Sequence, residues 1–323
     1  MARKKFLLTV TTYPLPSRTY DELVCTAGIC EDGSWIRIYP MPLSYLKEQK
    51  LKGVTKVRKY TWMELDVVPR ADSKKDFRPE SYSPLHYDFT DVQFLEHIDT
   101  KNNWAERKKW CLKNVYTNLT QLIEDSKAPT NKSLATFKPT RITDFLIEND
   151  DREWKEKWKA QFVQYQLNFD NPEQVTQRSI PRKMPYRFSY VFEDDNGRES
   201  TLMIEDWEIE ELYFNCLKTY GSEKVACQKV KEKYFDTYTT KHDVYLFLGT
   251  QYQHHMKRAK NPFVIIGVFA PQKVKKGRPF AIIFILEFVT SQQNRWTREE
   301  LILTLSVYFQ LPFGRLITKY EKF

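Results

Sequence analysis

Apolar and polar positions alternate in short runs through the N-terminal part of the chain, a pattern typical of β-strands. Between the second and third runs, Glu31-Asp32-Gly33-Ser34 supplies the turn residues of a hairpin. The predicted strands are residues 5–12, 21–30, 35–39 and 59–68, and a short helix is predicted at 43–49. A small barrel or a strongly bent sheet is the economical fold for these pieces.

The run from Trp35 to Tyr39 alternates at every position. Because neighbouring side chains of a strand point to opposite faces, Ile36 and Ile38 are predicted to face a core. Trp35, Arg37 and Tyr39 then share the other face, where an arginine lies between two rings. We take these three residues as candidates for contact with a base or a phosphate.

The middle of the chain has apolar residues at helical spacing. Cys111 and Val115 belong to an amphipathic helix predicted between residues 104 and 125, and a second helix is predicted at 151–167. Both apolar stripes are interpreted as packing surfaces. The polar segment 171–185 carries three prolines and no periodicity, which predicts a linker or a long loop.

A second β-rich unit follows this segment. Its first hairpin turns at Asp194-Asp195-Asn196-Gly197. The predicted strands are 187–192, 199–204, 244–248, 263–269 and 280–289, and the predicted helices are 206–220 and 223–235. We therefore expect an α+β fold with an N-terminal β-barrel-like domain, a helical connection and a C-terminal mixed α/β domain. The expected divisions are a β-rich domain at 1–98, a helical region at 99–170, the linker at 171–185 and the mixed domain at 186–323.

Composition adds positive charge and many rings to this picture. The chain has 51 Lys and Arg against 42 Asp and Glu, a formal net charge of +9, and 15% of its residues are aromatic. A cationic protein attracts polyanions, and exposed rings stack on bases, so nucleic acid is the expected partner. Rings also fill cores, so most of them are interpreted as packing residues.

The cysteines and the apolar runs bear on where the protein works. The five cysteines are odd in number and fall at no metal-site spacing, which favours reduced thiols in a cytoplasmic protein. The apolar run at the N-terminus is too short for a signal peptide, and segment 280–289 is about half the length that crosses a bilayer. Neither secretion nor membrane insertion is expected.

Two short segments carry side chains suited to catalysis. Asp206 and Glu208 follow a strand and open a helix, where the helix dipole alone can account for carboxylates. His254 and His255 follow another apolar strand, but adjacent side chains diverge, so the pair by itself is a poor metal site. These four are the candidate catalytic residues of a nuclease or base-processing hydrolase. A nuclease would use Mg²⁺, and no other cofactor is expected.

Several enzyme classes lack their motifs in this sequence. The chain contains neither phosphate-binding glycine loop, G-x-x-x-x-G-K-[ST] or G-x-G-x-x-G, and no nucleophile elbow. This argues against an ATPase, a dinucleotide-dependent oxidoreductase and a serine hydrolase.

The densest basic cluster lies near the predicted strands 244–248 and 263–269. It comprises Lys257, Arg258, Lys260, Lys273, Lys275, Lys276 and Arg278. Within it, Lys257, Arg258, Lys275 and Lys276 are the candidates for contact with a phosphate backbone. A solvated charged surface without a ligand is the alternative.

The segment 76–82 offers a second arginine and ring. The fixed φ of Pro79 could present Arg78 to a phosphate or base edge and Tyr82 as a stacking surface. The alternative is a structural loop in which Arg78 pairs with Glu80.

The C-terminal segment carries a resemblance. Thr297 and Glu300 form a capping box at the start of a predicted helix, and Leu311-Pro312-Phe313-Gly314 follows that helix. The segment from Trp296 to Leu316 resembles the helical leader that precedes the nuclease core of HNH-type restriction endonucleases. The Cys/His-bearing core that this family needs next does not follow, so the resemblance implies kinship with restriction or phage-defence modules and not HNH catalysis.

The N-terminal unit also resembles a known module. A barrel with an aromatic and arginine face is similar to the PUA-like modules that hold flipped or modified bases. We therefore predict a nucleic-acid-binding protein that recognises modified or unusual DNA in a bacterial or phage defence setting, with DNA favoured over RNA. The alternatives are a metal-dependent nuclease or base-processing hydrolase, and a protein-interaction subunit of a defence complex.

Overall fold

The structure is a computed structural model, and it describes residues 2–12, 15–16, 22–42, 59–72, 76–156 and 182–273. The chain divides into two compact units, residues 1–273 and 274–323, and every described residue belongs to the first. The predicted helices at 43–49 and 296–311, the predicted strand 280–289 and most of the predicted linker lie outside the described residues, as does the second half of the helix predicted at 151–167.

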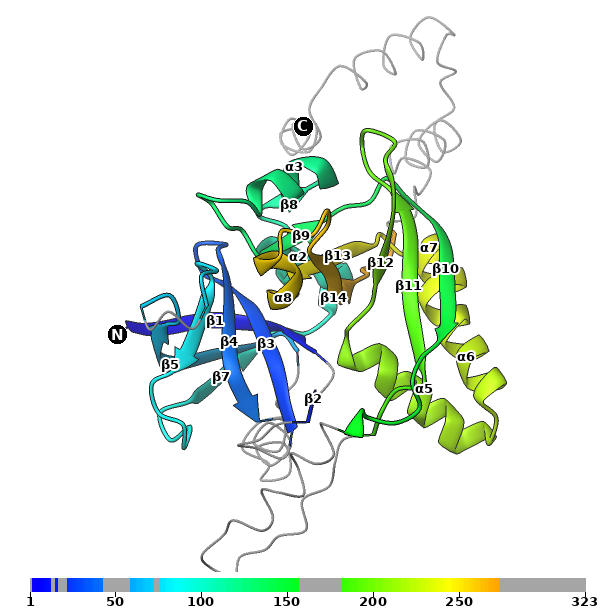
Figure 1. The fold of residues 1–323 in the computed structure, drawn as a ribbon, viewed down its shortest axis with the longest axis horizontal. Helices are drawn as coiled ribbons and strands as arrows, with labels where there is room; N and C mark the ends of the chain where they lie inside the picture. The colour runs from blue at the N-terminus through cyan, green and yellow to red at the C-terminus, as the bar shows by residue number, and fades with distance from the viewer. Residues whose placement is uncertain are drawn as a thin grey trace, which may run out of the picture. The chain divides into compact units, whose positions relative to one another are not determined.

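The N-terminal strands form a closed barrel (Figure 1). Its five strands, in the order of their pairing, are β1 (Ala2–Thr11), β3 (Glu22–Cys30), β4 (Trp35–Pro42), β6 (Ser81–Pro84) and β5 (Thr61–Pro69). The barrel closes because β1 pairs with β5 as well as with β3. Two further strands extend it, β2 (Leu15–Pro16) beside β3 and β7 (Gln93–His97) beside β5. The predicted strands of this part are confirmed.

Alternation explains the interior of the barrel. Phe6 and Leu8 of β1, Ile36 and Ile38 of β4 and Met63 of β5 are buried together in one apolar cluster. Each pair is separated by two positions and therefore points to one face of its strand. Gly28 lets β3 approach β1 closely, since a Cβ atom there would lie 2.3 Å from the carbonyl oxygen of Leu7.

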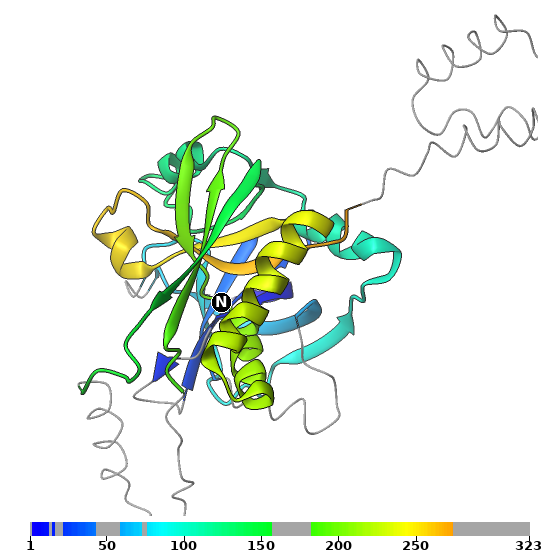
Figure 2. The same cartoon turned by 90° about the vertical axis from the view of Figure 1, so that its right-hand side faces the viewer.

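The second half of the described chain contains two sheets. The four-stranded sheet has the order β14 (Phe263–Phe269), β13 (Tyr245–Thr250), β9 (Leu134–Phe137) and β8 (Val115–Tyr116). The three-stranded antiparallel sheet comprises β10 (Arg141–Asn149), β11 (Tyr186–Glu193) and β12 (Glu199–Met203). Figure 2 shows the helices lying alongside the three-stranded sheet: α5 (Trp207–Tyr220), α6 (Glu223–Lys231), the π-helix η2 (Glu232–Thr237) and α7 (Tyr238–Lys241).

The helices pack on this sheet through rings. Tyr213 of α5 contacts Tyr186 and Phe188 of β11, with ring centroids 5.6 and 6.4 Å apart. Helix α5 begins at the cap residue Asp206 and ends at Gly221, whose φ of 65° is the left-handed conformation that stops a helix. The predicted hairpin and both predicted helices are confirmed here.

The helical region predicted at 99–170 is wrong in part. Within the described residues 99–156, only α2 (Lys101–Cys111), α3 (Leu119–Asp125) and Glu156 are helical, and β8, β9 and β10 are strands. The single helix predicted between 104 and 125 is interrupted because Val115 and Tyr116 pair with β9. Asn118 then caps a new helix by accepting a hydrogen bond from the Gln121 amide at 2.9 Å. The spacing of four between Cys111 and Val115 was therefore coincidental.

The barrel and the four-stranded sheet share a core. Trp35 of β4 packs edge-on against Phe247 of β13 at 5.2 Å, and Trp104 of α2 packs against Phe269 of β14 at 5.2 Å. These rings belong to one apolar cluster with Tyr60 and other residues from both parts. The described residues are consequently an α+β structure in which a closed barrel is joined to a mixed α/β region through buried side chains.

Candidate nucleic-acid interface

A basic loop joins β13 to β14. Residues 251–262 contain Lys257, Arg258 and Lys260 and no acidic residue, and they include the short helix α8 (Tyr252–Met256). All three cations are exposed, and within the described part of the chain their side chains have no ion-pair or hydrogen-bond partner. His254 is exposed beside them. An unpaired group of cations is the electrostatic requirement for binding a phosphate chain.

Apolar and aromatic side chains are exposed beside these cations. Phe77 is 37% exposed, and its ring lies 4.8 Å from His255 and 5.8 Å from Tyr252. Met256 is also exposed. We call this region the α8 surface, which comprises Phe77, Tyr252, His254, Met256, Lys257, Arg258 and Lys260. It combines positive charge with the exposed ring of Phe77 and the half-buried ring of Tyr252.

His255 anchors α8 to the rest of the molecule and is not at the surface. Its Nε2 lies 2.5 Å from the carbonyl oxygen of Ser126, which can only accept, so Nε2 carries the hydrogen. Nδ1 then accepts from the hydroxyl of Thr250 at 3.0 Å. Burial lowers the pKa of His255, the hydrogen bond to Ser126 opposes this, and the charges of Arg78 and Arg37 lower it further. The ring is therefore a neutral structural link, which makes it unsuitable as a surface acid.

The structure places Arg78 beneath the α8 surface, which corrects its assignment to nucleic acid. Its guanidinium holds both oxygens of Asp76, at 2.9 and 2.6 Å, and donates to the carbonyl oxygen of Thr250 at 2.8 Å. Burial would raise the pKa of Asp76, but the hydrogen bonds and charge of Arg78 more than offset this and lower it. Arg78 thus fixes the loop that presents Phe77, and Asp76, not Glu80, is its partner.

Arg37 is also buried, so the prediction that it contacts nucleic acid is wrong. Its guanidinium donates to the hydroxyls of Ser81 and Ser133, at 3.1 and 2.8 Å. Trp35 on the same face of β4 packs against Phe247. The second half of the chain therefore covers the face that sequence reasoning assigned to a ligand.

The two tyrosines of the barrel differ in exposure. Tyr39 stays 38% exposed, and the guanidinium of Arg70 lies 5.2 Å from its ring centroid. Tyr82 is half-buried on β6 and packs against the barrel interior, with Lys4 Nζ 5.8 Å from its ring centroid, and its stacking role stays a prediction. Neither ring is in the α8 surface.

Asp206 and Glu208 form an ion-pair group with Lys59. Lys59 Nζ lies 2.6 Å from the buried carboxylate of Asp206 and 3.2 Å from the exposed carboxylate of Glu208. Burial would lower the pKa of Lys59, but the two carboxylates more than offset this and raise it. Asp206 also caps α5 by accepting from the Glu208 amide at 3.2 Å. The pair has a structural role that needs no substrate.

The remaining predicted residues separate into two groups. Lys273 lies beyond the far end of β14 and donates to carbonyl oxygens of Thr239 and Thr240, so it is not part of the α8 surface. Lys275 and Lys276 lie outside the described residues. Of the residues predicted to bind nucleic acid, Lys257 and Arg258 are the two that the α8 surface contains.

Sequence reasoning missed Phe77 and Tyr252. Phe77 stands alone between Asp76 and Arg78, with no apolar neighbour at strand or helix spacing. An isolated ring in a charged loop is a usable signal of exposure. Tyr252 carried no such signal, because its place beside Phe77 comes only from folding.

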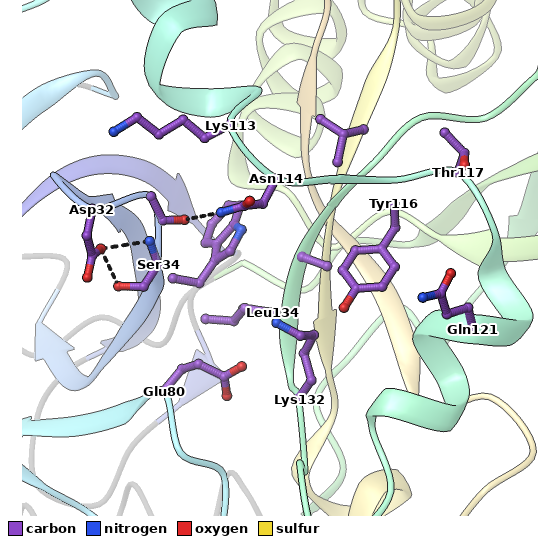
Figure 3. A pocket seen from close by; sticks show the side chains of 14 residues that line it. Asp32, Ser34, Glu80, Lys113, Asn114, Tyr116, Thr117, Gln121, Lys132 and Leu134 are labelled. Carbon is purple, nitrogen blue, oxygen red and sulfur yellow. Dashed lines mark hydrogen bonds between the residues drawn. The ribbon is translucent and has the colours of Figure 1, made fainter.

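A groove opens on one side of the barrel junction (Figure 3). Its cavity volume is about 770 Å³. One wall is the β3–β4 turn with Trp35, and the other comes from residues 113–117, Gln121 and residues 132–135, while Glu80 lies at the base of the view. Sequence reasoning did not find this groove, because its walls come from segments far apart in the chain.

The described residues contain neither a metal cluster nor a membrane span. No three His, Cys, Asp or Glu side chains lie close enough together there to hold a metal ion. None of the helices in those residues combines the length and the apolar character that crossing a membrane requires.

The described residues form an α+β protein with a closed N-terminal barrel, and the loop between β13 and β14 gives it an exposed basic surface. Residues 115–284, more than half of the chain, match the family described as "Domain of unknown function (DUF8757)", and the chain belongs to this family. Residues 2–113 match a second family, "Domain of unknown function (DUF8758)". The two matches meet directly after α2, whereas the sequence suggested a boundary after residue 98.

Two further comparisons complete the findings. No curated protein matches the chain. A solved structure described as "Structure of murine DNA binding protein bound with ds DNA" is similar over 86% of this chain and 99% of its own, at 8% identity and a TM-score of 0.27. A likeness at that TM-score carries no argument about function.

Proposed function

We propose that this protein binds nucleic acid through the α8 surface. The observation that carries the proposal is the group of three exposed cations, Lys257, Arg258 and Lys260, which have no partner among the described residues and follow α8, the helix that the exposed ring of Phe77 contacts. Each cation can displace a counterion from a phosphate, and the neighbouring rings can stack on bases. Buried hydrogen bonds of His255 and Arg78 hold this surface in place and so reduce the ordering cost of binding.

The test is binding of labelled DNA and RNA across a salt series. The double variant Lys257→Ala/Arg258→Ala should bind more weakly, and the slope of log affinity against log salt should fall by up to about 1.8 for duplex DNA, roughly 0.9 per phosphate contact. A matched control, Lys218→Ala/Lys224→Ala, removes the same charge from exposed positions on α5 and α6. Equal losses in the two variants would show that net charge acts without a defined surface.

The finer parts of the proposal concern the polymer and its setting. We propose that the protein binds DNA in preference to RNA and that the closed barrel is PUA-like. We also propose that the protein recognises modified or unusual DNA in a defence setting. Support comes from the barrel topology and from the resemblance of residues 296–316 to a restriction-enzyme segment. Matched DNA, RNA and base-modified DNA of one sequence, compared at one salt concentration, test the preferred polymer and the recognition of modified DNA. Equal affinity for plain and modified DNA would contradict the proposal that the protein recognises modified DNA.

A cytoplasmic location belongs to the same proposal. All five cysteines are free thiols, which suits a reducing compartment. Fractionation of cells that express the full chain tests this location. The rival function, a protein-interaction subunit, predicts no appreciable affinity for nucleic acid even at low salt.

A further inference from the structure

The groove beside the barrel differs from the α8 surface in its charge. Two lysines, Lys113 and Lys132, and two carboxylates, Asp32 and Glu80, line it. Their charges cancel, whereas the α8 surface carries three cations and no carboxylate. The groove therefore offers little attraction to a phosphate, and its occupant should be close to neutral.

Both carboxylates of the groove accept hydrogen bonds from serines of this chain. Asp32 accepts from the amide and hydroxyl of Ser34, at 2.8 and 2.6 Å, and these hydrogen bonds lower its pKa. Glu80 accepts from the amide and hydroxyl of Ser133, at 3.1 and 2.8 Å. Both oxygens of Glu80 are therefore bound to Ser133, and one oxygen of Asp32 is bound to Ser34.

An amide and a ring are among the groups that line the groove, and Lys132 Nζ lies 5.8 Å from the centroid of that ring, which belongs to Tyr116. Gln121 is exposed on α3, and its side chain has no partner within the described residues. Tyr116 presents its half-buried ring, while its hydroxyl donates to Asp125 at 2.7 Å. Figure 3 shows the Tyr116 ring between Lys132 and Gln121. A ring offers a stacking platform, and a glutamine amide can pair with the donor and acceptor edge of a base.

A continuous set of hydrogen bonds connects the groove to the α8 surface. Glu80 in the groove binds Ser133, the carbonyl oxygen of Ser133 accepts from the amide of Thr250, and the hydroxyl of Thr250 binds His255 in α8. Residues 77 and 80 are also separated by only three positions, a span of at most about 11 Å. Buried hydrogen bonds therefore connect the neutral groove to α8, and Glu80 of the groove lies three positions from Phe77 of the α8 surface.

We infer that the groove accepts an unpaired base of a strand whose phosphates lie on the α8 surface. This inference rests on the proposed function and makes it more specific, because it predicts a preference for single-stranded over fully paired nucleic acid. Phosphates select the basic surface by charge, and a base selects the groove by stacking and hydrogen bonding. Duplex DNA keeps its bases stacked and cannot fill the groove without unpairing.

The test compares two single-stranded oligonucleotides of equal length and charge. One carries all its bases, and the other has abasic sites at every internal position. The full chain should bind the base-bearing strand roughly 5- to 100-fold more tightly, the range that stacking of one base on an aromatic side chain supplies. Equal affinity for both strands would overturn the inference and the stacking of bases on Phe77, and it would leave the binding of phosphates by the three cations standing. Binding to neither strand, nor to duplex DNA, would overturn the proposed function itself.

Variants locate the base. Tyr116→Leu removes the ring and should abolish most of the preference for the base-bearing strand, whereas Tyr116→Phe keeps the ring and should retain it. Gln121→Ala, at an exposed helical position, should reduce the preference about two- to tenfold without unfolding α3, and Gln228→Ala on α6 is its control. Tyr116→Leu and Gln121→Ala should both leave the affinity for the abasic strand unchanged. If Gln121→Ala and Tyr116→Leu, each verified as folded by circular dichroism, keep the full preference, the base lies elsewhere and the inference is wrong.

Discussion

Arg78 and Arg258 have the same side chain and opposite surroundings. Arg78 is 7% exposed and bound to Asp76 and Thr250, whereas Arg258 is exposed and unpaired within the described residues. A buried guanidinium must have its donors satisfied inside the protein, while an exposed one can exchange water for a phosphate. At this scale, burial decides whether an arginine holds the fold or contacts a ligand.

This difference predicts that the same substitution has a large effect on stability at position 78 and a small one at position 258. Arg78→Met removes the closest cation of the buried carboxylate of Asp76 and leaves Arg70 3.8 Å away, so it should lower the free energy of unfolding by about 3–5 kcal/mol. Arg258→Met should change it by no more than about 0.5 kcal/mol. Urea denaturation of both variants at pH 7 gives the comparison. If Arg78→Met lowers the free energy of unfolding as little as Arg258→Met does, the buried pair of Arg78 and Asp76 contributes little to stability.

His255 predicts a dependence of stability on pH. Its pKa is lower in the folded protein than its ordinary value near 6.5, because burial disfavours the charged ring. The unfolded chain then binds more protons between the two pKa values, so the free energy of unfolding should fall as the pH drops below about 6.5, by at most about 1.4 kcal/mol per pH unit.

Urea denaturation between pH 5 and 8 measures this slope. His255→Gln should flatten it, and His254→Gln, at the exposed neighbouring position, should leave it unchanged. A slope that persists in His255→Gln would assign the titration to another group.

At the scale of elements, local patterns predicted those elements whose formation is local. The β3–β4 hairpin turns at Gly33, whose φ is 89°, and the β11–β12 hairpin turns at Gly197, whose φ is 74°, so both turns were visible as glycine-containing tetrapeptides. The helix predicted across 104–125 was wrong because Val115 pairs with Thr136, a residue distant in sequence. Such pairing overrides helical periodicity and leaves no local signal.

The residues at the start of α5 are predicted to differ in how much they stabilise the fold. Asp206→Ala removes a helix cap and leaves Lys59 buried without its main partner, so it should cost about 3–5 kcal/mol. Glu208→Ala removes an exposed carboxylate and should cost less than about 1 kcal/mol. Thermal and urea unfolding measure both variants. A small loss in Asp206→Ala would refute the structural role, and loss of nuclease activity in a folded Asp206→Ala protein would revive the catalytic one.

At the scale of the whole molecule, each family match has an apolar cluster made almost entirely of its own residues, and the two matches share a third cluster. Trp35, Tyr60 and Trp104 from the first match share an apolar cluster with Phe247 and Phe269 from the second. Buried rings of this kind contribute most of the apolar area of a core. The two parts should therefore depend on each other for stability.

Separate expression tests this dependence. Residues 1–113 alone would expose the rings that now pack on Phe247 and Phe269, so this fragment should show no cooperative thermal transition and should bind a hydrophobic dye. Mixing it with a fragment of residues 114–323 should restore a cooperative transition. Cooperative unfolding of the first fragment alone would show that the barrel is independent.

The sequence by itself determined the strands of the barrel, the second hairpin, α5 and α6, and the surplus of cations in residues 251–262, because each depends on neighbouring residues. Only the tertiary structure decided that Arg37 and Arg78 are buried, that Phe77 lies beside Tyr252, and that a groove forms between residues 32–35 and Gln121. These features join segments far apart in the chain. Whether a side chain faces water or another segment is settled by packing, which periodicity along one strand or helix does not encode.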